Sequence, residues 1–482
     1  MGRFDDYVNY FDTYQKIYGE RTTVLYQCGM FYEVYGIDNQ FEKLGHAAEI
    51  AQLLNIQLTR TDKSNPENNR SNPLMTGFPV NYIERHLRVL IDNNYTVVIV
   101  DQVREKIVGG KKVQEREVTA IHSPATYVNN YMTENYLVCI YLDSHKLKGK
   151  TLYDIGLTAI DLSTGKNYAH QSLSTNSDSF RSLDDTYRFI QTLQPTEIIY
   201  ASPESKPTSL FDNLSNMDNV LLHKREPKDS FLKNSFHNQY LREFFPDSGL
   251  LSVVEYLDLD FKQSTAIAYC IMLEFCKDHN KNLLKQLKRP TIWDNNKTLI
   301  LDNNAINQLN LINTGRHSKN GSVLDIITET STNMGKRLLK TRLLNPEVNL
   351  AEINRRYSYI ELMMEIVSDK IILNLIKSKK DKLNWYLVVE QYLREITDIE
   401  RYHRKIETGT LQPTEYTNLY NSYTVITKLI ELIRTHKFFE LVGEQLSIEF
   451  KKYLDDCNVI DLEKASKYNL NDITDNFFKK GY

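Results

Sequence analysis

Residues 24–35 restrict the fold more than any other segment, because β-branched and aromatic side chains dominate it and predict a β-strand. Side chains two positions apart in a strand share a face, so Phe31 and Glu33 would project together. Gly29, just before them, lets a backbone approach a partner closely. Such a ring and carboxylate could enter a DNA minor groove, the ring unstacking a base step and the acid accepting a hydrogen bond. The alternative is an ordinary strand with a solvated glutamate.

The first 125 residues read as one mixed α/β domain. Residues 5–18 predict a helix, because aromatic side chains recur there at helical spacing. Strands flanked by such helices favour one compact core. The further elements that we expect are helices at 41–54 and 82–93, a loop at 58–73, a strand at 95–103 and a turn at 109–112.

A second α/β domain is predicted after the first, with a helix at 184–193 and strands at 136–142, 154–161 and 197–201. Residues 202–235 are polar, and we expect irregular structure there. Beyond residue 250 helical spacing predominates, beginning with an apolar run at 264–279. The predicted fold class is therefore multidomain α/β plus α, with domains at 1–125, 126–250 and 251–482.

Composition restricts the location and the partners of the chain. With 482 residues it is too long for one core. It contains no apolar run of about 18 residues that would predict a transmembrane helix, so we expect no membrane among its partners. The five cysteines form no metal-binding spacing and the N-terminus lacks a secretory pattern, so we expect a reducing, intracellular compartment. The net charge of −3 argues against a broad, sequence-blind polyanion binder, so nucleic-acid contact would use local basic patches and shape.

Four further motifs follow the 24–35 segment in order, at residues 76–79 (Thr-Gly-Phe-Pro), 82–90, 97–103 and 116–126. Together the five segments resemble the N-terminal mismatch-binding domain of the MutS family of DNA mismatch-repair proteins. The Asp-x-Ser-x-Gly turn that begins at Asp161 is similar to a turn in the family's connector domain, which implies an RNase H-like α/β fold there. Residues 299–346 and 398–413 resemble the mostly helical core, or lever, domain.

The resemblance implies a way of binding double-stranded DNA that carries a mismatch or a small loop. Phe31 would wedge into the duplex from the minor groove and stack on a mispaired or unpaired base, while Glu33 would hydrogen-bond that base. Phosphate contacts would add salt-dependent affinity without specificity. The candidates for such contacts, each of which could equally be solvated surface, are Arg60, Arg70, Lys111 and Lys112.

One residue departs from the family's pattern. The family usually has an acidic residue between the glycine and the phenylalanine, where this chain has Met30. In a strand Met30 would face away from Phe31 and Glu33, so we expect a change in packing or surface rather than a lost function.

Catalytic motifs are missing, and we expect no catalytic residue, metal site or cofactor in this chain. The nearest match to a phosphate-binding loop, residues 144–151, has serine in place of the first glycine and no helix after it, so we interpret it as a solvated turn. Full-length MutS relatives are ATPases that use ATP and magnesium. The resemblance covers the family's N-terminal half to two-thirds, so we expect the clamp and the ATPase region to be absent.

Three hypotheses about function are open at this point. The first is recognition of mismatched DNA, as a homodimer or with a MutS-like partner. The second is a non-catalytic adaptor that docks other proteins through its connector and core, and loss of Glu33 without effect would favour it. The third is an enzyme whose ATPase lies on a separate polypeptide.

Overall fold

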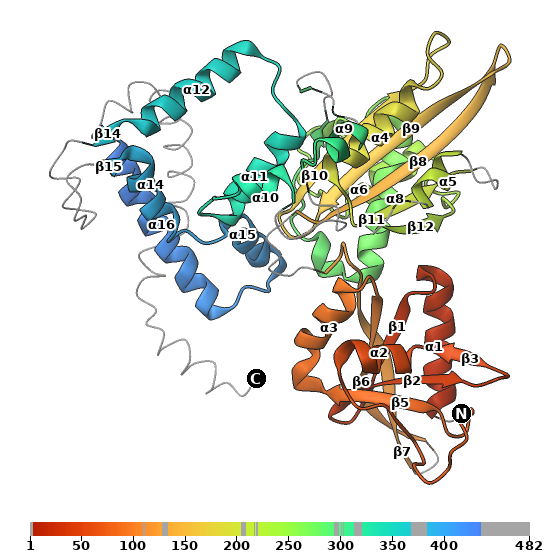
Figure 1. The fold of residues 1–482 in the computed structure, drawn as a ribbon. Helices are drawn as coiled ribbons and strands as arrows, with labels where there is room; N and C mark the ends of the chain where they lie inside the picture. Colours follow the sequence, from red (N-terminus) through yellow and green to blue (C-terminus); the bar gives the residue numbers. More distant parts are fainter. Residues whose placement is uncertain are drawn as a thin grey trace. The chain divides into compact units, whose positions relative to one another are not determined.

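The computed structural model describes residues 3–108, 111–127, 134–203, 209–215, 217, 220–293, 298–299, 301, 303–312, 321–367 and 383–434. The chain divides into two compact units (Figure 1). The first comprises Met1–Asn130 with Asn135–Trp293, and the second comprises Tyr131–Glu134 with Asp294–Tyr482. Among the helices in the described ranges, none is long and apolar enough to cross a membrane.

A seven-stranded sheet organises the N-terminal part of the first unit, with the order β4-β5-β2-β1-β6-β7 and with β3 paired to β2. Among the described residues of this sheet, β1 and β6 pair in parallel, and the other neighbouring strands pair antiparallel. The strands are β1 (Thr22–Cys28), β2 (Phe31–Asp38), β3 (Lys43–Gly45), β4 (Thr59–Arg60), β5 (Leu74–Pro79), β6 (Thr96–Val108) and β7 (Lys111–His122).

Helices cover both faces of this sheet because alternate residues of its central strands are apolar on either side. Tyr35 on β2 belongs to a core cluster with α1 (Arg3–Tyr18). The next residue toward the N-terminus, Val34, belongs to a different cluster, which includes α2 (Ala47–Leu54) and α3 (Ile83–Asp92). Successive residues of β2 therefore alternate between the two faces, as the period of a strand requires.

A second sheet of six strands follows, with the order β12-β11-β8-β9-β10-β13. Its strands are β8 (Tyr136–Leu147), β9 (Lys150–Asp161), β10 (Lys166–Leu173), β11 (Glu197–Ala201), β12 (Leu221–Arg225) and β13 (Thr291–Ile292). The helices of this part are α4 (Arg181–Leu193), α5 (Ser209–Ser215), α6 (Asn234–Leu241), α7 (Val253–Tyr256) and α8 (Gln263–His279).

Helix α8 is apolar on nearly all sides because it lies in the interior of the first unit and packs on β8 and β9. The close approach depends on Gly156 of β9, where an added Cβ would lie 2.1 Å from the carbonyl carbon of Ser264. The predicted boundary at residue 250 separates this helix from the sheet that it covers, whereas the compact unit continues to Trp293.

The second unit is mostly helical in its described residues. The side chain of Arg337 is 1% exposed and donates to both carboxylate oxygens of Asp398, at 2.6 and 2.8 Å, and to Glu400 at 2.7 Å. Its elements are α9 (Asn303–Gln308), α10 (Val323–Ile327), α11 (Asn333–Leu344), α12 (Leu350–Met364), β14 (Ile366–Val367), β15 (Leu383–Asn384), α14 (Trp385–Leu393), α15 (Ile399–Thr408) and α16 (Pro413–Arg434).

The predicted class, multidomain α/β plus α, is confirmed in this outline, whereas the RNase H-like fold of the connector remains a prediction. Several local predictions are wrong. The loop expected at 58–73 contains the short strand β4, which pairs with β5. Residues 24–35 are two strands rather than one, and the predicted helix at 41–54 begins only at Ala47, after the short strand β3. Residues 202–235 are not wholly irregular, because they contain α5 and β12.

Candidate nucleic-acid interface

The segment that carries Phe31 is the tip of a β-hairpin. Cys28 on β1 pairs with Phe31 on β2, which leaves Gly29 and Met30 as a two-residue turn. Gly29 has φ of 60°, while Met30 is not among the positive-φ residues, which is the pattern of a type II′ turn. Met30 therefore lies in the turn, and the prediction that it faces away from Phe31 within one strand is wrong. The Met30 side chain is 68% exposed.

Hydrogen bonds fix this turn to the strands on both sides. The Gly29 backbone N–H donates to Gln102 Oε1 on β6 at 3.2 Å, and the Gln102 backbone N–H donates to Gln27 Oε1 at 2.8 Å. On the other side, the Val80 N–H donates to the Met30 carbonyl oxygen at 2.9 Å. The tip is thus anchored to the sheet rather than free like an ordinary loop.

Phe31 and Glu33 lie on the same face of β2, as the strand period predicts, and Phe31 is 47% exposed. The residue between them, Tyr32, is buried on the opposite face. Its hydroxyl donates to Asp101 Oδ1 at 2.6 Å, and the Thr119 hydroxyl donates to the other oxygen of the same carboxylate at 2.5 Å. These bonds tie the Tyr32 face of β2 to β6 and β7, which holds Phe31 on the other face.

Glu33 is partly buried and occupies a defined position. The Tyr35 hydroxyl donates to Glu33 Oε2, and Gly77 of β5 lies opposite Glu33 in the strand register. A Cβ added to Gly77 would lie 2.7 Å from the Tyr32 carbonyl oxygen and 3.4 Å from Glu33 Cγ. The glycine of the Thr-Gly-Phe-Pro motif therefore makes room for the glutamate and for close strand pairing. Sequence reasoning missed Tyr35, although its place two residues after Glu33 marks the shared face.

The predicted phosphate contacts lie elsewhere in the same domain. Arg70 pairs with Glu42, with its Nη2 2.7 Å from Oε1, and Arg60 Nη1 donates to the Asn65 carbonyl oxygen at 3.0 Å. Both cations thus have intramolecular partners, and their contact with DNA remains a prediction. Lys111 and Lys112 begin β7, but their side chains, like all of Gly109 and Gly110, lie outside the described residues.

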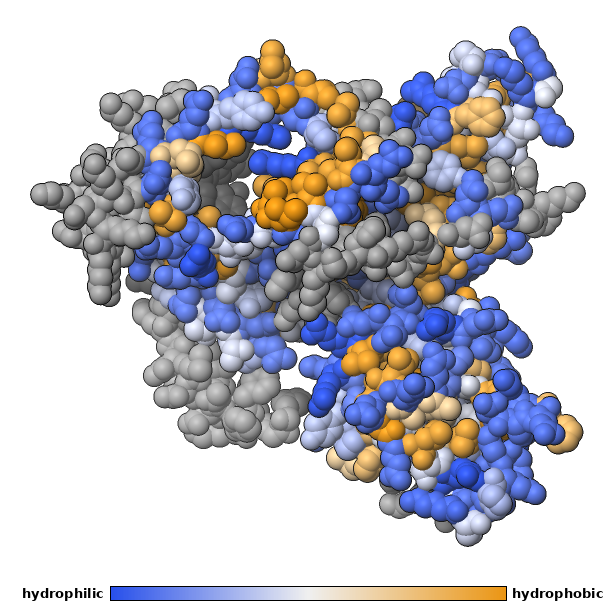
Figure 2. Space-filling model, in the orientation of Figure 1, coloured by the Kyte–Doolittle hydropathy of each residue, from blue (hydrophilic) through white to orange (hydrophobic). Residues whose placement is uncertain are grey.

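The surface of this domain is chemically mixed. On the face in view, separate hydrophobic groups lie within a mainly hydrophilic surface, over the N-terminal segment at the lower right (Figure 2). A ligand of that face would meet scattered apolar contacts between polar ones, not one continuous apolar surface.

Residues 144–151, the nearest match to a phosphate loop, form the tip of the β8–β9 hairpin. Ser144 pairs with Tyr153, and Leu147 pairs with Lys150 around the turn residues Lys148 and Gly149. Because a strand and not a helix follows this turn, its backbone N–H groups are not arranged to hold phosphates. The residues do not fit ATP with magnesium, and the interpretation as a turn is confirmed.

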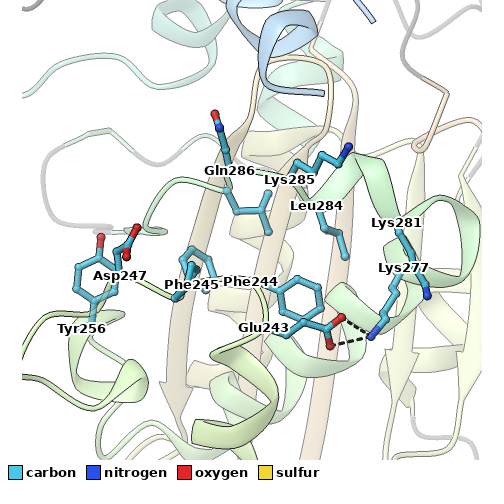
Figure 3. Close-up of a pocket in the computed structure, with 12 residues that line it drawn as sticks. Glu243, Phe244, Phe245, Asp247, Tyr256, Lys277, Lys281, Leu284, Lys285 and Gln286 are labelled. Atoms are coloured by element: carbon cyan, nitrogen blue, oxygen red, sulfur yellow. Dashed lines mark hydrogen bonds and ion pairs between the residues drawn. The ribbon is translucent and has the colours of Figure 1, made fainter. Parts of the chain in front are cut away.

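A cavity of about 510 Å³ lies in the same unit, beside the segment that follows α8 (Figure 3). Lys277 Nζ donates to both carboxylate oxygens of Glu243, at 2.7 and 2.8 Å, and lies over the Phe244 ring. Acids and lysines occur together in the lining, so the cavity does not favour a strongly charged ligand. Sequence analysis did not anticipate it, because the lining comes from separate segments: Glu243, Phe244, Phe245, Pro246, Asp247, Tyr256, Lys277, Lys281, Leu284, Lys285, Gln286 and Leu287.

Comparison with known proteins finds matches to two family models and to many relatives. The model of MutS domain I matches residues 9–131, and the model of MutS domain III matches residues 304–474. A DNA mismatch repair protein mutS homolog of Acanthamoeba polyphaga mimivirus is 33% identical over 517 residues, which cover 98% of this chain and 44% of that protein.

More distant relatives agree with this result. The DNA mismatch repair protein MutS of Fervidobacterium nodosum is 26% identical over 86% of this chain and 42% of its own length. The mitochondrial DNA mismatch repair protein mutS homolog of Sarcophyton glaucum is 25% identical over 84% of this chain and 41% of its own. The chain thus spans somewhat less than half the length of these relatives. Together with the two domain models, these similarities place the chain in the MutS family.

Proposed function

We propose that this chain recognises mispaired or unpaired bases in double-stranded DNA for mismatch repair. In this proposal Phe31 is a wedge that enters the minor groove, and Glu33 accepts a hydrogen bond from the displaced base. The observation that carries it is a half-exposed aromatic ring beside a carboxylate, on one face of an anchored hairpin tip.

The selectivity would come from the deformability of the DNA. Inserting a ring between base steps costs a few kcal/mol of unstacking, and a mismatch lowers that cost because the pair is already weakened. Phe31 therefore gains most where stacking is weakest, without reading sequence. Glu33 adds a polar contact that an intact base pair does not offer.

The remaining parts of the activity follow from the relatives as proposals. We infer that the chain acts as a homodimer or with a MutS-like partner, as the family resemblance implies. The ATP-dependent steps of full-length relatives are assigned to none of the described residues. The relatives named above come from a virus, a mitochondrion and a bacterium, which is compatible with an intracellular site of action.

The test is binding to a duplex with one G·T mismatch or one unpaired thymine, compared with the matched duplex at one fixed salt concentration. Phe31→Ala is the variant, and Phe41→Ala is the matched control, because Phe41 is 96% exposed and lies outside the hairpin tip. Stacking of one base on an aromatic ring contributes about 1–3 kcal/mol, so Phe31→Ala should lower lesion affinity roughly 5- to 150-fold.

The wild type and Phe41→Ala should both prefer the lesion duplex. If the wild type shows no preference, or if Phe31→Ala retains the full preference, the wedge is idle and the proposal fails. In that case the adaptor hypothesis would take its place.

A further inference from the structure

The strand that carries Phe31 and Glu33 places a third side chain on the same face. Tyr35 is 4% exposed, and its hydroxyl donates a hydrogen bond to Glu33 Oε2. The three residues stand at alternate positions of β2, so the face changes from an exposed ring to a carboxylate and then to a buried phenol.

Packing in the core fixes the position of the Tyr35 hydroxyl. Its ring makes edge-to-face contacts with the rings of Tyr7 and Phe4, both on α1, with distances between ring centroids of 5.1 and 6.0 Å. The hydroxyl also lies 4.0 Å from Cys28 Sγ. Because the ring is held between helix and sheet, the hydroxyl cannot follow the glutamate to another rotamer. The hydrogen bond therefore constrains Glu33 rather than Tyr35.

The surroundings keep Tyr35 a donor. Burial raises the pKa of the Tyr35 hydroxyl, so it retains its proton at every ordinary pH. Burial likewise raises the pKa of the Cys28 thiol to about 11. The guanidinium of Arg3 lies within electrostatic reach of Cys28, Tyr35 and Glu33.

We propose that Tyr35 is a positioning residue, which holds the Glu33 carboxylate in the orientation that receives a base beside Phe31. A carboxylate has about four acceptor sites, so the bond from Tyr35 fixes the side chain and leaves acceptor capacity for the base. The inference rests on the proposed function. It adds that the Glu33 carboxylate is oriented before DNA binds.

The size of the effect follows from pre-organisation. Immobilising a flexible side chain on binding lowers affinity roughly 2- to 12-fold. In the wild type that ordering is complete before DNA binds. Tyr35→Phe keeps the ring that packs on α1 and removes only the hydroxyl, so it should lower affinity for the lesion duplex by this factor. Affinity for the matched duplex should stay the same, because Glu33 has no displaced base to bind there.

The experiment is a double-mutant cycle on lesion and matched duplexes with Tyr35→Phe, Glu33→Ala and the double variant. Tyr10→Phe is the control, since it also removes one partly buried hydroxyl from the same domain, but on α1, where the hydroxyl donates to the Arg116 carbonyl oxygen at 3.0 Å. If Tyr35 acts through Glu33, Tyr35→Phe should weaken lesion binding in the wild type and have no effect in Glu33→Ala. The control should retain the lesion preference.

The outcomes separate this inference from the function on which it rests. A wild type without lesion preference overturns both. A wild type with lesion preference that Tyr35→Phe leaves intact overturns the positioning role alone. The role is also overturned if Tyr35→Phe weakens matched and lesion binding equally, or if its effect persists in Glu33→Ala, because the hydroxyl would then act through the fold and not through the carboxylate.

Discussion

His279, at the end of α8, provides a quantitative test of how burial sets the stability of the first unit. Its side chain is buried, its Nδ1 is 2.8 Å from the Phe275 carbonyl oxygen, and its ring packs on Phe275 and Tyr18. Burial lowers the pKa of His279 from 6.5 to about 4, against the opposing charge of Glu197 and in the same direction as the charges of two neighbouring histidines.

The sign of the pH effect follows from which state binds the proton. At pH 5 the unfolded chain carries a protonated His279, because its pKa there is near 6.5, whereas the folded chain keeps the ring neutral. The contribution of the neutral ring to the free energy of unfolding is therefore fully present above pH 6.5, and it is lost as the pH falls toward 4. Integrating the linkage between pH 7.5 and 5.0 gives a loss of about 2 kcal/mol from this one residue.

The chain contains two tryptophans, one in each unit, which makes a local assay possible. In a Trp385→Phe background, urea unfolding followed by Trp293 fluorescence reports on the first unit. His279→Phe keeps an aromatic ring but cannot titrate. Between pH 7.5 and 5.0 the free energy of unfolding should fall about 2 kcal/mol further in the parent than in His279→Phe. Parallel pH dependences in the two proteins would refute the reasoning.

Three other substitutions test packing and capping, each by urea unfolding followed through the tryptophan of its own unit. Gly156→Ala would place a Cβ 2.1 Å from the Ser264 backbone, so we expect α8 to shift and the first unit to lose about 3 kcal/mol. Arg337→Met leaves the buried carboxylate of Asp398 without its bidentate partner and should cost the second unit about 3–5 kcal/mol. Ser252→Ala removes the capping box of α7 and should cost about 1 kcal/mol. Unchanged unfolding midpoints would contradict these expectations.

The sequence was sufficient to predict the shared face of Phe31 and Glu33, since that depends only on the period of a strand. It did not show the turn between β1 and β2. Most side chains of residues 24–35 are β-branched or aromatic and favour a strand. In the structure the strand is interrupted at the turn, where Gly29 has a positive φ. The local sequence signal for a type II′ turn is a glycine at its first central position. Within a run of strand-forming residues, such a glycine is easily interpreted as part of one strand.

The missed strand β3 has a tertiary cause. Residues 41–54 contain apolar side chains at helical spacing, but Gly45 pairs with Gly36 on β2. A Cβ on Gly45 would lie 2.3 Å from the Tyr35 carbonyl oxygen, so the backbone can approach only because that residue is glycine. Pairing with a neighbouring strand overrides local helix preference there, and no pattern within residues 41–46 reveals the partner.

A wedge must be stiffer than the object that it deforms. Kinking a duplex at one step costs a few kcal/mol, and a ring on a free loop would move aside before the base pair opened. Here β2 is paired on both sides, to β1 and to β5, and the turn at Gly29 is hydrogen-bonded to β6. The buried Tyr32 hydroxyl holds the opposite face. In the proposed function the strain of binding would therefore fall on the DNA. Its cost would depend on how firmly the contacted base pair is stacked, which is the property that distinguishes a mismatch from a correct pair.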